Sequence, residues 1–176
     1  MTELMEFTQA VAREAGGLIV LEREQADLTH DYKGGTELVT NADIMADELI
    51  RSRIEQQFPA HLILSEESSP ELQRVWESDA PVWIVDPIDG TRAFIAGKPI
   101  FGTLVALCDK GFPLLGLIDM PCLDEMYIGY FDESLKYSSV TLNGSEISAS
   151  KRIELSQASR SSPMAFTHFS SPSSAP

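Results

Sequence analysis

Two closely spaced aspartates are the residues of this sequence whose types and spacing most clearly suit a chemical role. Asp86 and Asp89 follow the apolar run 82–85, which predicts a buried strand delivering both carboxylates to its carboxyl end. Pro87 is expected to set a turn between them, and Gly90 lets the backbone bend tightly. Two like charges this close need a counter-charge, and a divalent cation with oxygen ligands supplies one. The pattern predicts a cation site, with a polar turn whose acids cap a helix as the alternative.

A second acidic pair follows another short apolar segment. Glu66 and Glu67 come directly after residues 62–64, which predict a strand. In open α/β sheets, sites form outside the carboxyl ends of strands. By itself this pair is typical of a solvated loop. Together with Asp86 and Asp89, it favours one shared cation site.

The residues after Asp89 predict a place for an anion. Gly90 and Thr91 open a short helix that Gly97 and Pro99 close. The free N–H groups at such a start attract phosphate. Carboxylates for Mg²⁺ beside N–H groups for phosphate indicate metal-assisted phosphoester hydrolysis. Phosphatases that attack through an aspartate in a D-x-D-G-T motif would need that nucleophile at Pro87, so attack by water activated by the metal is favoured.

The elements that must position these residues indicate an α+β or layered α/β fold. Apolar periodicity predicts a helix over 4–21, and a second helix is expected after an N-cap at Asn41, ending at Pro59. Six strands follow, and the last ends at the turn Asn143-Gly144. They are expected at 62–64, 82–85, 101–108, 114–120, 125–131 and 137–142, with the third and fourth joined as an antiparallel hairpin through residues 109–111.

Composition narrows the classes of partner. The 176 residues include 27 acidic and 13 basic side chains, for a net charge of −14, which argues against nucleic acid and anionic membranes as partners. No uninterrupted apolar run exceeds five residues, so no membrane span is expected. Two cysteines exclude a disulfide scaffold, and the acidic N-terminus does not resemble a secretory signal. A cytoplasmic location is therefore expected.

Three blocks, in order, resemble the signatures of one family. Residues 83–91 resemble W-x-x-D-P-[IL]-D-G-T, residues 39–43 resemble V-T-x-x-D, and residues 65–68 resemble G-E-E-S, with Ser65 where glycine is usual. These are the signatures of the inositol monophosphatase family of Mg²⁺-dependent, lithium-sensitive phosphatases. The resemblance covers roughly residues 1–154 and implies the N-terminal part of the family's α-β-α-β-α sugar-phosphatase fold, without its C-terminal α/β half.

The resemblance also implies roles for individual residues. Two or three Mg²⁺ ions would be held by Glu66, Asp86, the Ile88 carbonyl, Asp89 and, for the weakest ion, Asp43. Glu66 and Thr91 would position and activate the attacking water. The N–H groups of Gly90 and Thr91 would hold the phosphate of a small phosphorylated metabolite. A homodimer is implied as well.

Residues 92–104 and 116–121 look more like the histidinol-phosphatase branch than the inositol branch. The leading hypothesis is therefore hydrolysis of L-histidinol phosphate to L-histidinol and phosphate. Hydrolysis of inositol-1-phosphate or another sugar phosphate is the first alternative. An inactive, metal-binding fragment is the second.

The C-terminal end departs from the family pattern. Residues 155–176 contain eight serines and three prolines and no acidic residue, which predicts an atypical tail after a phosphatase domain at 1–154. The family's W-D-x-A-A segment, whose aspartate completes the second metal site, has no counterpart here. A truncated or frame-shifted sequence, or a fragment, is the interpretation that this departure favours, with a genuine short isoform as the alternative.

Overall fold

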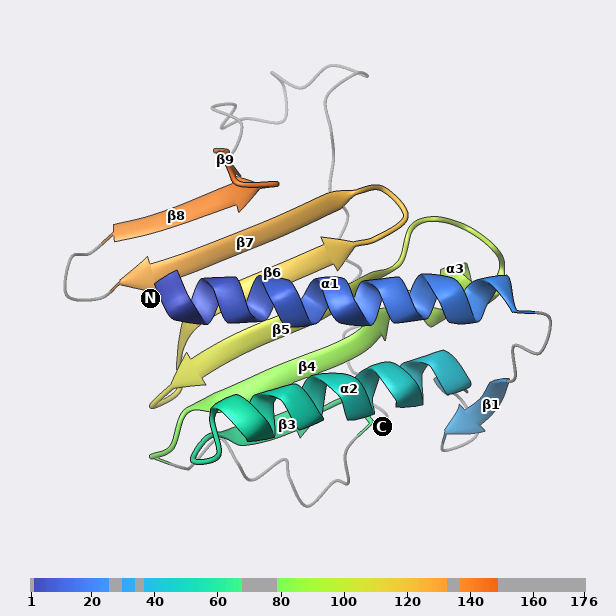
Figure 1. Ribbon diagram of the computed structural model, residues 1–176, viewed down its shortest axis with the longest axis horizontal. Helices are drawn as coiled ribbons and strands as arrows, with labels where there is room; N and C mark the ends of the chain where they lie inside the picture. The colour runs from blue at the N-terminus through green and yellow to red at the C-terminus, as the bar shows by residue number, and fades with distance from the viewer. Residues whose placement is uncertain (1, 26–29, 34–36, 68–78, 133–136, 149–176) are drawn as a thin grey trace, which may run out of the picture.

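A seven-stranded β-sheet organises the computed structural model, which describes residues 2–25, 30–33, 37–67, 79–132 and 137–148 (Figure 1). Its strand order follows the chain, β3-β4-β5-β6-β7-β8-β9. The first pair, β3 with β4, is parallel and the other pairs are antiparallel. The strands are β3 (Leu62–Ser65), β4 (Val82–Asp89), β5 (Gly102–Asp109), β6 (Phe112–Met120), β7 (Glu125–Asp132), β8 (Tyr137–Leu142) and β9 (Ser145–Glu146).

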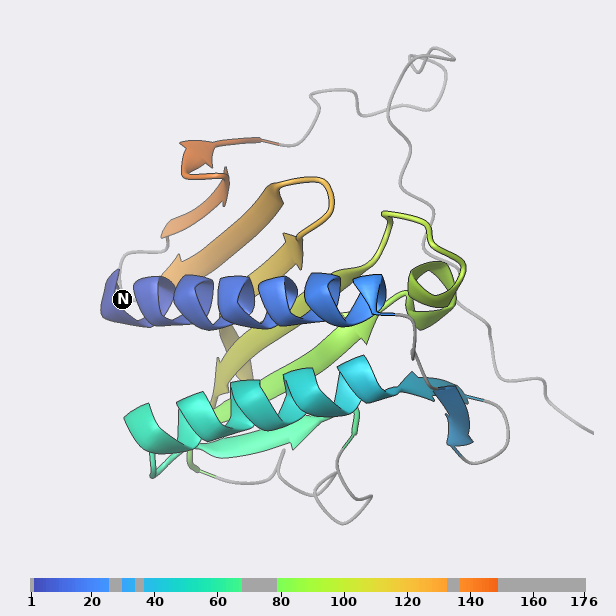
Figure 2. The same ribbon diagram turned by 45° about the vertical axis from the view of Figure 1, so that its right-hand side comes forward.

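Two helices cover one face of this sheet, as Figures 1 and 2 show. Helix α1 (Thr2–Glu24) packs on β5 and β6, and α2 (Asn41–Gln57) packs on β4. Each helix turns a stripe of small and β-branched residues inward, which lets its backbone approach the strands closely. The buried stripe of α1 ends before Leu21, which is 63% exposed although the periodicity runs through it. No helix within the described ranges is long and apolar enough to cross a bilayer.

The core lies between these helices and the inward face of the sheet. Alternate residues of each central strand are buried, as expected for a sheet with one covered face. Trp83, Phe94 and Phe101 are the largest side chains in this core. His61 borders it: the Trp83 indole N–H donates to His61 Nδ1 at 3.0 Å, and the His61 ring stacks on Phe58. His61 is therefore a packed, half-buried residue and does not ligate a metal through Nδ1.

The structure confirms the layered α/β fold class and the order of the predicted strands. Both predicted hairpin turns have their tight-turn geometry, with φ of +50° at Lys110 and +49° at Asn143, each followed by a glycine at positive φ. The antiparallel hairpin β1 (His30–Lys33) with β2 (Glu37–Thr40) was not predicted, because its strands have no run of apolar residues.

The start of α2 differs from the prediction by one residue. Thr40, not Asn41, is the N-cap, and it forms a capping box with Asp43. The Asp43 backbone N–H donates to Thr40 Oγ1 at 3.3 Å, and the Thr40 backbone N–H donates to Asp43 Oδ2 at 2.8 Å. A threonine followed three residues later by an acid satisfies two otherwise unpaired N–H groups, which a single Asn41 cap would not do.

Candidate functional site

The parallel pairing of β3 with β4 brings the two acidic pairs together. Ser65 lies opposite Val85 in the register, and the Glu66 N–H donates to the Val85 carbonyl at 3.0 Å. Glu66 therefore leaves β3 next to the point where Asp86 occupies β4. This juxtaposition is what the two strand ends predicted, and it depends on the strands being both adjacent and parallel.

Asp86 is the most perturbed carboxyl group at this edge. Burial, with help from the neighbouring Glu66, Asp89 and Asp43 carboxylates, raises the pKa of Asp86 to about 8. Its Oδ1 atom is buried and has no hydrogen-bond partner among the described residues. We call these four residues, Asp43, Glu66, Asp86 and Asp89, the acidic cluster. Their mutual repulsion is the electrostatic situation that a cation relieves.

The backbone between Asp86 and Asp89 differs from the predicted turn. Strand β4 continues through Pro87 and Ile88 to Asp89, and one extra residue bulges out of its pairing with β5. Pro87 lacks an N–H and is tolerated at such a bulge, while its carbonyl accepts a hydrogen bond from the buried Thr103 Oγ1 at 2.9 Å. The bulge, rather than a reverse turn, re-aims the Asp89 side chain.

A tight turn then leads into helix α3 (Thr91–Ile95). Gly90 has φ +89°, and a Cβ there would lie 3.1 Å from the Ile100 carbonyl oxygen, so both the conformation and the space require glycine. The Thr91 hydroxyl donates to the Ile88 carbonyl at 3.1 Å. With only five residues, α3 contributes little dipole, so the turn itself presents the N–H groups at this point.

Asp43, the most buried member of the acidic cluster, lies in a polar layer with its neighbours on α2. Asp43 is 3% exposed, and burial raises its pKa despite its hydrogen bonds to Thr40. Asp47, one turn further along α2, accepts a hydrogen bond from the buried Ser65 hydroxyl. Ser65, where the family usually has glycine, is therefore held by α2. The sequence did not single out Asp47, although its four-residue spacing from Asp43 places both on one face of the helix.

The donor set fits Mg²⁺ in chemistry, because it consists of carboxylate and carbonyl oxygens. The buried, unpaired Asp86 Oδ1 and the raised pKa of Asp86 indicate that this edge favours a positive charge. Among the described residues, no three His, Cys, Asp or Glu side chains already converge as a metal-holding group. The roles of Glu66, Asp86, Ile88, Asp89, Asp43, Gly90 and Thr91 therefore stay predictions, although the fold gathers these residues at one edge.

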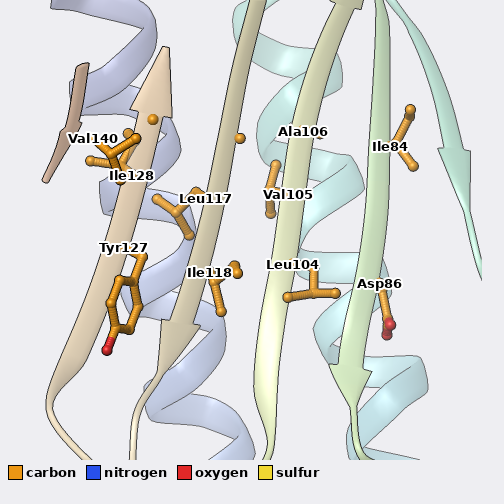
Figure 3. Close-up of a pocket in the computed structure, with 12 residues that line it drawn as sticks. Ile84, Asp86, Leu104, Val105, Ala106, Leu117, Ile118, Tyr127, Ile128 and Val140 are labelled. Atoms are coloured by element: carbon orange, nitrogen blue, oxygen red, sulfur yellow. The ribbon is translucent and has the colours of Figure 1, made fainter. Parts of the chain in front are cut away.

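Strand β4 carries Asp86 at the end of an apolar surface on the other face of the sheet (Figure 3). This surface forms an open hollow of about 540 Å³. Two rows of residues in register cross it, and among the described residues no helix covers it. One row is Ile84, Ala106, Gly116, Gly129 and Val140, and the other is Asp86, Leu104, Ile118 and Tyr127.

Comparison with known proteins shows the family of this chain. The model of the inositol monophosphatase family matches residues 1–175. The bifunctional phosphatase IMPL2, chloroplastic, of Arabidopsis thaliana is 49% identical over 120 residues, which are 68% of this chain and 33% of that protein. The histidinol-phosphatase of Chlorobaculum parvum is 34% identical over 150 residues, which are 85% of this chain and 54% of that protein.

Solved structures share the fold. An IMPase of Thermotoga maritima superimposes with a TM-score of 0.73 at 30% identity, covering 86% of this chain and 55% of its own. The extragenic suppressor protein suhB of Bartonella henselae gives a TM-score of 0.74 at 28% identity, covering 85% and 55%. The fold thus defines a layered α/β protein with the architecture of the sugar-phosphatase fold. The chain belongs to the inositol monophosphatase family, and it spans between a third and just over half of the length of these relatives.

Proposed function

We propose that this chain supplies the metal-binding and phosphate-binding part of a Mg²⁺-dependent phosphomonoesterase. The observation that carries the proposal is the Asp86 carboxylate, which has a buried, unpaired oxygen, three acidic neighbours and a tight Gly90–Thr91 turn that begins four residues further along the chain. Family membership supports the same reading. Because the chain spans only part of the length of these relatives, an activity of the chain itself is a proposal.

The roles that we propose for the individual residues come from the resemblance of their motifs to those of the family. Asp86, Asp89, Glu66 and the Ile88 carbonyl would hold two Mg²⁺ ions, and Asp43, already engaged by Thr40, would support a third. Bound Mg²⁺ would neutralise the cluster, activate water and stabilise the leaving alkoxide. Glu66 and Thr91 would position the attacking water. The N–H groups of Gly90 and Thr91 would hold the phosphate, whose negative charge the metal-free cluster would repel.

For the substrate we propose L-histidinol phosphate, hydrolysed to L-histidinol and phosphate. Support comes from residues 92–104 and 116–121 and from the relative named as a histidinol-phosphatase. The comparisons support inositol-1-phosphate equally, since a relative from Solanum lycopersicum named inositol monophosphatase 3 is 30% identical over 158 residues. The residues at 92–104 and 116–121 are what favours histidinol phosphate. We also expect a homodimer in the cytoplasm, which sedimentation of the purified chain and microscopy of the tagged chain would test.

Calorimetry of Mg²⁺ binding to the 176-residue chain tests the metal site. Because the pKa of Asp86 is about 8 without metal, Mg²⁺ should release about one proton on binding at pH 7. Titrations in buffers of different ionisation enthalpy measure that proton. Asp86→Asn should abolish the binding, whereas Asp79→Asn, at an exposed position, should leave it intact. Equal binding by the Asp86→Asn variant would contradict the proposed site.

Phosphate release tests the reaction. The chain is incubated with L-histidinol phosphate or inositol-1-phosphate, with Mg²⁺ and after chelation, and kcat/KM is compared between the two substrates. The proposal expects release that stops when Mg²⁺ is removed and that is faster for histidinol phosphate. Mg²⁺ binding without turnover of either substrate would support the inactive-fragment alternative instead.

A further inference from the structure

Arg23, in the last turn of α1, contacts three segments that are distant in sequence. One guanidinium nitrogen, Nη2, donates to the Gly97 carbonyl, and the other, Nη1, donates to Cys122 Sγ at 3.3 Å. The centre of the guanidinium lies 5.3 Å from the centroid of the Phe101 ring. One half-buried side chain therefore joins α1 to the segment after α3, to the residue before β5 and to the β6–β7 connection.

These contacts continue from Arg23 into α3. The Phe101 ring, 2% exposed, meets the fully buried Phe94 of α3 edge to face, with centroids 5.1 Å apart. The Phe94 N–H donates to the Gly90 carbonyl at 3.0 Å, and the Gly97 N–H donates to the Phe94 carbonyl at 3.1 Å. Each link is a direct contact, so a displacement of the segment at Gly97 reaches Phe94 and then Gly90.

The packing around Gly90 leaves little tolerance for such a displacement. A Cβ at Gly90 would lie 3.1 Å from the Ile100 carbonyl oxygen and 3.4 Å from Phe101 Cα. Ile100 and Phe101 are therefore the residues against which the Gly90–Thr91 turn packs. We expect a shift of these two residues to alter the direction of the Thr91 hydroxyl, which donates to the Ile88 carbonyl.

The chemistry of the contacts requires arginine. The planar guanidinium has donors on separate nitrogens and a face that stacks on an aromatic ring, so it serves three partners in fixed directions. Lysine has one compact ammonium group and cannot reach Gly97, Cys122 and Phe101 together.

We propose that Arg23 is a positioning residue that holds the Gly90–Thr91 turn in its position relative to the acidic cluster. The proposal rests on the proposed function for the meaning of that turn. Arg23 does not act on substrate in this role, because its two terminal nitrogens already donate to Gly97 and Cys122. Removing the guanidinium should leave the fold in place and loosen the turn.

Nuclear magnetic resonance of the 15N-labelled 176-residue chain tests the proposal. The variants are Arg23→Met, Arg23→Lys and, as a matched control, Arg53→Met, which removes an arginine that bonds Glu14 on the exposed surface. Amide exchange is measured at Gly97 and Lys98, whose N–H groups bond the Phe94 and Ala93 carbonyls. The amide shift of Thr91 is followed with Mg²⁺ and increasing inorganic phosphate.

Arg23→Met should speed exchange at Gly97 and Lys98 roughly tenfold and weaken the phosphate response at Thr91 by a similar factor, because a charge-assisted hydrogen bond is lost. Arg23→Lys should fall between Arg23→Met and the unaltered chain. The control should match the unaltered chain at all three amides. A purely stabilising role for Arg23 would instead change exchange evenly along α1 and the sheet, with no separate effect at Thr91.

Wild-type exchange at Gly97 and Lys98 in Arg23→Met, with an unmoved Thr91 amide, would overturn the proposal. If the unaltered chain shows no phosphate response, the proposed function is contradicted, while the exchange rates and the metal-free Thr91 shift still decide the role of Arg23. If Arg23→Met does not fold, the comparison of Arg23→Lys with Arg53→Met decides it by the same criteria.

Discussion

The carboxyl group of Asp119 is buried where β6 passes α1. It is 6% exposed, and a Cβ on Gly16 would lie 2.6 Å from its Oδ2. Burial raises its pKa to about 6, with Asp124 adding to the effect and Arg13 opposing it. A carboxyl group whose pKa is raised on folding stabilises the folded state at a pH below its pKa in the unfolded chain, here 3.8. That contribution to the free energy of unfolding is lost as the pH rises through the pKa in the folded state, about 6.

Asp119→Asn should therefore raise the free energy of unfolding at pH 7 by on the order of 2 kcal/mol. The substitution keeps the shape of the side chain and removes the charge that must be buried above pH 6. Urea denaturation between pH 4 and pH 8 measures the effect. The variant should show less loss of stability over that range than the unaltered chain, and the exposed Asp79→Asn should not. Parallel pH profiles for all three proteins would contradict this account.

At the scale of single elements, the capping box decides where α2 begins. Thr40→Ala removes the hydroxyl that accepts the Asp43 N–H and should lower the free energy of unfolding by about 1 kcal/mol. Thr40→Ser keeps the hydroxyl and serves as the control, with a smaller effect. Chemical denaturation of both variants measures the difference. Equal losses in the two variants would show that the threonine methyl group, rather than the cap, matters.

The turn between β4 and α3 favours glycine at position 90 more strongly than α2 favours its cap. Gly90→Ala places a Cβ at φ +89° and against the Ile100 carbonyl, so it should cost about 1–3 kcal/mol of stability. Gly111→Ala is the matched control, because Gly111 has φ +80° with nothing within 4 Å of an added Cβ. Thermal unfolding of Gly111→Ala measures the cost of backbone strain alone, and thermal unfolding of Gly90→Ala measures that strain plus steric crowding. A Gly90→Ala variant no less stable than Gly111→Ala would contradict the crowding.

At the scale of the whole molecule, the sheet is covered on one side only in the part of the chain that the structure describes. Ile118 is 45% exposed and Val140 is 44% exposed on the uncovered face, beside the small residues Gly116 and Gly129. An apolar surface of this kind binds hydrophobic molecules or associates with itself. The chain should therefore bind an apolar fluorescent dye and self-associate as its concentration rises.

Ile118→Glu should reduce both the dye fluorescence and the self-association, because it places a charge between Leu104 and Tyr127 on the apolar surface. Leu21→Glu is the comparison, since Leu21 is 63% exposed but lies on α1, on the opposite side of the sheet. Dye titration and sedimentation velocity give the two readouts. An equal reduction by Leu21→Glu would show that the response is not specific to the sheet face.

Much of this molecule follows from local sequence patterns. Six strands, two long helices and the turns at Lys110 and Asn143 were predicted because alternation, helical periodicity and turn residues act over a few neighbours. The hairpin of β1 with β2 was missed because its strands have no such pattern. The N-cap of α2 was predicted at Asn41 because asparagine is itself a favoured capping residue. The reciprocal hydrogen bonds between Thr40 and Asp43 place the cap at Thr40 instead.

The candidate site, like the fold, was predictable in part from the sequence. By itself, the sequence determined which acids lie at strand ends and which family they resemble, because residue type and spacing along one segment carry that information. Only the tertiary structure placed β3 parallel to β4 and so set Glu66 beside Asp86, replaced the expected turn at Pro87 by a bulge, and joined Arg23 to Gly97. Such contacts depend on the packing of distant segments, and burial in that packing is also what raises the pKa of Asp86 and Asp119.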